Sequence, residues 1–62
     1  MNTTAYYRRL ATEHETRLEW GHAADAWQMA IDAYPPHDSL GQRDLENMEQ
    51  RRQDCLRSYF PA

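Results

Sequence analysis

Residues 20–36 read WGHAADAWQMAIDAYPP and decide the fold. Their apolar side chains recur every three or four residues, which is the spacing of one face of an α-helix. The positions on this face are Trp20, Ala23, Ala24, Trp27, Ala30, Ile31 and Tyr34. Two prolines follow, and proline cannot continue the hydrogen-bond ladder of a helix. The stretch therefore predicts a helix over residues 21–34.

A second apolar face precedes this helix, with Tyr7, Leu10, His14 and Leu18 in one row. On a single continuous helix the two faces would lie roughly 145° apart, so a straight rod would expose one of them. We therefore expect the chain to turn between Leu18 and Gly21. The result is an antiparallel helical hairpin of residues 4–18 and 21–34.

The segment after the prolines favours a third helix over residues 40–58. About nineteen residues make a helix of roughly 28 Å, longer than either helix of the hairpin. The expected fold is all-α: one domain, residues 1–62, in which a longer C-terminal helix crosses the hairpin. Its core is expected to contain Tyr7, Leu10, Trp27, Ile31, Leu45, Met48 and Cys55.

The small size of the chain predicts self-association. A domain of 62 residues gains only about 3–5 kcal/mol from its core, so small domains often rely on disulfides, metals or oligomers. One cysteine cannot form an internal disulfide, and the histidines lack metal-ligand spacing. We expect a homodimer that buries part of the third helix together with Tyr59 and Phe60.

Composition and charge exclude several classes of function. Seven arginines against ten acidic residues give a net charge of -3, which disfavours direct nucleic-acid binding. No nucleophile elbow or phosphate-binding loop is present, so we expect no enzyme, cofactor or metal. The sequence has neither a membrane-spanning apolar run nor the pattern of a signal peptide, which predicts a cytoplasmic protein.

Two groups of residues are candidates for binding a partner. Arg52 projects onto the apolar face of the third helix, and Arg51 lies beside it. A buried guanidinium must extend to solvent, pair with a carboxylate of the hairpin, or meet another protein. Trp20, Tyr59 and Phe60 form the second group, because aromatic residues are enriched at interfaces. Core packing is the alternative for the tryptophans.

The histidines and the cysteine have structural interpretations. His14 lies within an apolar face and is expected to be a half-buried, hydrogen-bonded packing residue. His22 and His37 are expected in exposed loops. Cys55 is expected to pack as a small apolar group, because no resolving cysteine accompanies it.

Two family patterns bear on function. The spacing of Trp20, Ala23, Trp27, Ala30 and Pro35 is similar to the second helix of a tetratricopeptide unit, but a single unit cannot build a solenoid. A longer pattern covers residues 6–56. It joins Tyr7, Leu10 and Ala11 to Ala23, Ala24, Trp27 and Ala30, and ends in R-R-x-x-C at Arg51, Arg52 and Cys55.

This pattern resembles the ANR family, which are negative regulators of AraC-type activators in enteric bacteria and phages, and the related PerC-like regulators. The resemblance implies a transcriptional regulator that binds an AraC-type activator and impairs its dimerisation or DNA binding. Two alternatives remain open. One is a phage-encoded inhibitor of another host protein, such as a nuclease or defence complex, and the other is a subunit or adaptor without a regulatory role.

Overall fold

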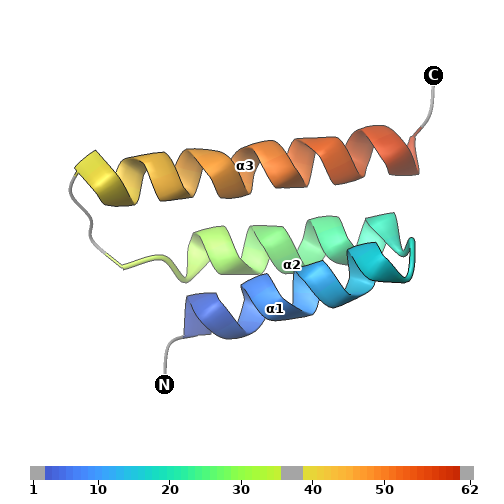
Figure 1. The fold of residues 1–62 in the computed structure, drawn as a ribbon, viewed down its shortest axis with the longest axis horizontal. Coiled ribbons are helices and arrows are strands. Elements are labelled where there is room, and N and C mark those ends of the chain that lie inside the picture. The colour runs from blue at the N-terminus through green and yellow to red at the C-terminus, as the bar shows by residue number, and fades with distance from the viewer. Residues whose placement is uncertain (1–2, 36–38, 61–62) are drawn as a thin grey trace.

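The fold is an all-α bundle of three helices. The computed structural model describes residues 3–35 and 39–60, in which α1 is Thr3–Thr16, α2 is Trp20–Asp32 and α3 is Ser39–Tyr59. Figure 1 shows successive helices running in opposite directions, with α3 lying along the hairpin of α1 and α2. The expected all-α fold of three helices is confirmed.

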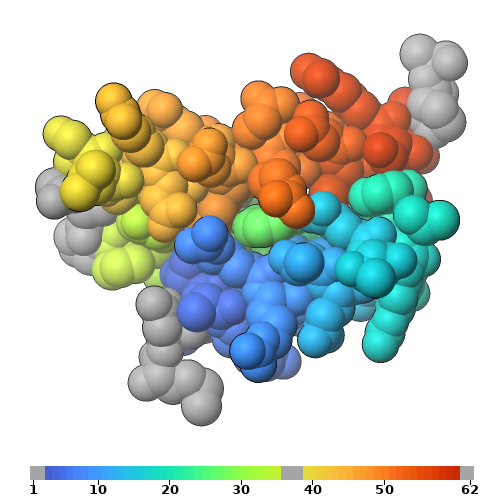
Figure 2. All heavy atoms as spheres, viewed as in Figure 1, coloured from blue at the N-terminus to red at the C-terminus, as the bar shows by residue number. Residues whose placement is uncertain are grey.

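Helix α2 is the centre of the bundle, because it packs against both α1 and α3. The buried core consists of Ala11, Ala23, Ala24, Ala26, Trp27, Ala30, Met48 and Cys55. Five of these eight side chains are alanine. Because the distance between packed helices depends on the side chains at the contact, these small side chains favour close packing of the helices. In Figure 2 the middle of α2, in green, is visible as a narrow strip between α1 and α3.

The predicted core residues divide into two groups. Trp27, Met48 and Cys55 belong to the buried cluster, and Met48 is its largest fully buried side chain. The other four are half-buried and pack against the cluster: Tyr7, Leu10, Ile31 and Leu45. A three-helix domain of this size has too little interior to enclose every large side chain.

The corner between α1 and α2 differs from the prediction. Helix α1 ends at Thr16, and Leu18 has a φ of 63°, in the left-handed region. The backbone N–H of Leu18 donates to Glu15 O at 2.9 Å, and that of Glu19 donates to His14 O at 2.8 Å. This pair of bonds is the Schellman motif that ends many helices. Leu18 is therefore a turn residue, 69% exposed, and does not belong to the buried face of α1.

The other helix ends lie close to their predicted positions. Helix α2 ends at Asp32, two residues before the predicted end, and α3 begins one residue early and ends one residue late. With 21 residues, α3 is longer than α1 and α2, which have 14 and 13. His22 is in the first turn of α2, not in a loop, although it is exposed as expected. His37 lies outside the described residues.

None of the described helices combines the length and the apolar character that a membrane span requires.

Candidate protein-binding groove

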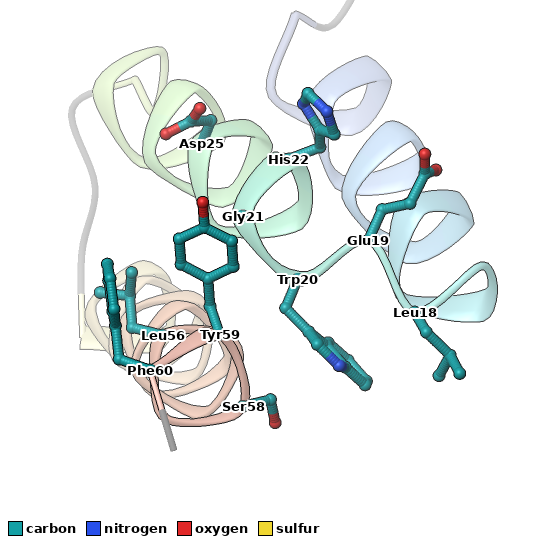
Figure 3. Close-up of a pocket in the computed structure, with 10 residues that line it drawn as sticks. All are labelled: Leu18, Glu19, Trp20, Gly21, His22, Asp25, Leu56, Ser58, Tyr59 and Phe60. Atoms are coloured by element: carbon teal, nitrogen blue, oxygen red, sulfur yellow. The ribbon is translucent and has the colours of Figure 1, made fainter. Parts of the chain in front are cut away.

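A groove lies at the end of the bundle where the α1–α2 corner meets the end of α3 (Figure 3). Its volume is about 680 Å³. We call it the end groove, and its lining residues are Leu18, Glu19, Trp20, Gly21, His22, Asp25, Leu56, Ser58, Tyr59 and Phe60. They come from the corner, the first two turns of α2 and the last turn of α3.

The end groove displays large apolar side chains to solvent. Leu18 and Phe60 are both 69% exposed, and Tyr59 is 55% exposed. The rings of Tyr59 and Phe60 pack edge to face, with their centroids 4.6 Å apart. Large apolar side chains that are exposed around one groove are typical of an interaction site. The end groove is therefore the strongest candidate site of the described residues.

Gly21 sets the position of the Tyr59 ring. A Cβ atom at Gly21 would lie 3.0 Å from Tyr59 Cε1 and 3.2 Å from its Cζ, tighter than ordinary van der Waals contact. The missing side chain lets the ring lie directly against the backbone of α2, as Figure 3 shows. Gly21, where the sequence predicts the end of the turn, lies inside α2 and permits this close approach.

The edge of the end groove is acidic. Glu19, His22 and Asp25 line it, and none of the ten lining residues is lysine or arginine. His14 Nδ1 lies 3.0 Å from Glu19 Oε1, and this hydrogen bond holds the pKa of Glu19 below its usual value of 4.5. The half-buried His14 is thus the hydrogen-bonded packing residue expected from the sequence. Its ring also contacts that of His22, with centroids 5.3 Å apart.

The end groove brings together three of the five residues predicted to bind a partner: Trp20, Tyr59 and Phe60. Sequence reasoning did not single out Leu18 or Asp25 for this site. Leu18 was missed because its apolar side chain matched the buried row of α1. Asp25 was missed because a lone carboxylate on a helix carries no signal of a groove.

Arg51 has a different environment, on the side of the bundle where α1 approaches α3. Its Nη2 atom donates to Glu15 Oε1 at 2.8 Å, and its Cζ atom lies 5.2 Å from the centroid of the Trp27 ring. Trp27 Nε1 donates to the other carboxylate oxygen of Glu15 at 2.7 Å. One carboxylate of α1 therefore joins α2 and α3. Arg51 is exposed, and its guanidinium pairs with a carboxylate of the hairpin.

Arg52 is half-buried on α3, and its side chain forms no hydrogen bond or ion pair within residues 3–35 and 39–60. It does not line the end groove. The structure thus separates the two arginines, and only Arg52 keeps a free guanidinium for a partner.

Cys55 is buried beside the Glu15 carboxylate. Burial, together with the negative charge of Glu15, raises the pKa of the thiol to about 11. A thiol with this pKa is a poor nucleophile at neutral pH. In the part of the chain that the structure describes, no three His, Cys, Asp or Glu side chains are grouped so as to hold a metal ion.

No protein family, curated protein or solved structure matches the chain.

Proposed function

We propose that the chain is a small regulator that acts in the cytoplasm by binding another protein through the end groove. The exposed surface of Leu18, Tyr59 and Phe60 carries this proposal. These side chains are held by α2 and α3 and by the hydrogen-bonded corner, so the apolar surface is formed before a partner arrives. Preorganised aromatic side chains bind at a low entropic cost.

The resemblance to the ANR family suggests an AraC-type transcription activator as the partner. Binding would impair the dimerisation or the DNA binding of the activator. The net charge of -3 supports regulation through protein contact over direct competition for DNA, because DNA affinity depends on cations that neutralise phosphates. No catalytic step, metal or cofactor is part of this proposal.

The test is a titration of the purified chain against AraC-type activators from the same genome, with DNA binding by each activator followed in a gel-shift assay. Phe60→Ser should weaken binding at least about tenfold, the loss expected of a central aromatic residue at an interface. Leu40→Ser is the matched control, because Leu40 is 74% exposed but lies at the opposite end of α3. It should bind like the wild type.

Binding by the wild type and by Phe60→Ser in this assay separates the alternative functions. The proposal is wrong if no AraC-type activator binds at micromolar concentration. If a host nuclease or defence protein binds instead and Phe60→Ser weakens that binding equally, the chain is better explained as a phage-encoded inhibitor of that protein. Normal binding of the activator by Phe60→Ser would place the docking surface elsewhere, and Arg52→Ala would then be the variant to examine.

A further inference from the structure

We infer that the end groove binds a segment of its partner in which an arginine stands beside a large apolar side chain. This inference rests on the proposed function and deepens it, because it names the chemistry that the groove selects. The lining contains aromatic rings and carboxylates, and none of its residues is lysine or arginine. The face of an aromatic ring attracts a cation, and a carboxylate accepts charge-assisted hydrogen bonds from a guanidinium.

One carboxylate and two aromatic rings form a row along the groove. Gly21 and Asp25 are four residues apart on α2, so they lie on the same face of that helix. The Tyr59 ring lies against Gly21, and the Phe60 ring packs edge to face on Tyr59. Figure 3 shows the same order, with Tyr59 between Asp25 and Phe60. An arginine can therefore cover the Tyr59 ring and reach Asp25, while the apolar residue next to that arginine contacts Phe60.

Asp25 is the carboxylate that is available to a partner. Its side chain is exposed and has no hydrogen bond or ion pair within residues 3–35 and 39–60. Glu19 is the other carboxylate of the lining, and its Oε1 atom already lies 3.0 Å from His14 Nδ1. The groove therefore offers one unpaired anion, and its place beside the aromatic rings determines where a guanidinium would lie.

The bundle already holds one arginine in this way. The Arg51 guanidinium lies 5.2 Å from the centroid of the Trp27 ring, and its Nη2 atom donates to Glu15 Oε1 at 2.8 Å. A planar guanidinium can stack on a ring and pair with a carboxylate at the same time, whereas the ammonium of lysine has no planar face. Tyr59 and Asp25 provide the ring and the carboxylate of such a site, so the partner has to provide the arginine.

NMR titration of the full chain with a short peptide tests the inference. The probe is a capped peptide with Leu-Arg-Leu at its centre and with glycine and serine elsewhere. The chain has two tryptophans, whose indole N–H signals serve as reporter and control. Trp20 lines the groove, whereas Trp27 is buried and donates to Glu15. The peptide at millimolar concentration should shift the Trp20 signal and leave the Trp27 signal in place, and an unchanged Trp20 signal overturns the inference.

Two further peptides, with lysine or glutamine in place of the arginine, test the charge contact. The arginine peptide should bind about threefold more tightly than the glutamine peptide, the effect of an ion pair at an exposed site, with lysine between them. Asp25→Asn should weaken the arginine peptide by about the same factor and leave the glutamine peptide unaffected. Equal binding of the arginine and glutamine peptides overturns the inference.

Asp32→Asn is the matched control for Asp25→Asn. Both residues are exposed on α2, and both variants change the net charge equally, but Asp32 does not line the groove. Asp32→Asn should bind the arginine peptide like the wild type, and circular dichroism should show the same helix content in both variants. Equal effects of the two substitutions on peptide binding overturn the assigned contact with Asp25.

The inference and the proposed function fail in different ways. If the arginine peptide binds as described but no AraC-type activator binds, the proposed function is wrong and the inference stands. If an activator binds and Phe60→Ser weakens that binding, but Asp25→Asn binds the activator like the wild type, the proposed function stands and the inference is wrong. If dilution of the chain alone shifts the Trp20 signal, the homodimer expected from the sequence occupies the groove, and the inference is overturned.

Discussion

The left-handed conformation of Leu18 makes a specific prediction about the corner between α1 and α2. Its φ of 63° lies where a side chain is strained, at a cost of about 1–2 kcal/mol for a residue other than glycine. Leu18→Gly removes this strain, and Leu18→Ala retains it. The two variants lose nearly the same apolar contact, so a comparison between them isolates the backbone conformation.

The expected difference follows from two opposing terms. Glycine relieves about 1–2 kcal/mol of strain, but its greater freedom in the unfolded chain costs about 0.4–1 kcal/mol. Leu18→Gly should therefore unfold with a free energy about 1 kcal/mol larger than Leu18→Ala. In a domain of 60–100 residues, this difference raises the Tm by about 4–8 °C. The free energy of unfolding of the wild type should lie between those of the two variants. Leu18 is 69% exposed, so truncating its side chain removes little buried surface.

Thermal and urea unfolding followed by circular dichroism measure the difference. Arg9 provides the matched control, because it is exposed and lies in the interior of α1. There the order should reverse, with Arg9→Ala more stable than Arg9→Gly by about 1 kcal/mol, the difference in helix propensity. If Leu18→Ala is as stable as Leu18→Gly or more so, the Schellman corner is wrong and α1 continues through residue 18.

Three further predictions concern the interior. Trp27→Ala should cost about 3–5 kcal/mol and leave the chain largely unfolded, because Trp27 is only 4% exposed; a cooperative melt near that of the wild type would contradict its place in the core. Arg51→Ala should lower the unfolding free energy by about 1 kcal/mol through loss of its contacts with Glu15 and Trp27, whereas Arg52→Ala should have a smaller effect, and equal melts would contradict this assignment. The raised pKa of Cys55, about 11 against an ordinary 9.0, gives stability that is complete below pH 9 and is lost as the pH rises toward 11. The unfolding free energy of the wild type should therefore fall more steeply than that of Cys55→Ala over this range, and parallel pH profiles would refute the shift.

The hairpin could be predicted from the sequence because it depends on local periodicity. Two apolar rows that are out of phase require a turn, and prolines set the end of the second helix. The turn residue could not be predicted. Leucine favours helices, and the left-handed conformation of Leu18 depends on hydrogen bonds to Glu15 and on the entry of α2. The close approach of Tyr59 to Gly21 depends on how α3 packs, which local spacing does not contain.

The candidate site could be predicted in part. A surplus of aromatic residues indicated Trp20, Tyr59 and Phe60, and these meet at one end of the bundle. The arginine pair enters two environments, because adjacent residues on a helix point about 100° apart, and its role in partner binding stays a prediction. Arg51 reaches Glu15, whose role depends on the relative positions of three helices. The sequence gives no sign that this carboxylate differs from the others.

The Glu15 carboxylate has a consequence for cooperativity. It accepts hydrogen bonds from Trp27 on α2 and from Arg51 on α3, so both bonds form only when both of these helices are packed against α1. If α3 detached, the half-buried Glu15 carboxylate would lose its ion pair with Arg51, and the ring of Trp27 would lose its contact with the Arg51 guanidinium. Detachment of α3 therefore also destabilises the hairpin of α1 and α2. The bundle should unfold in one step, with no populated state in which the hairpin survives alone.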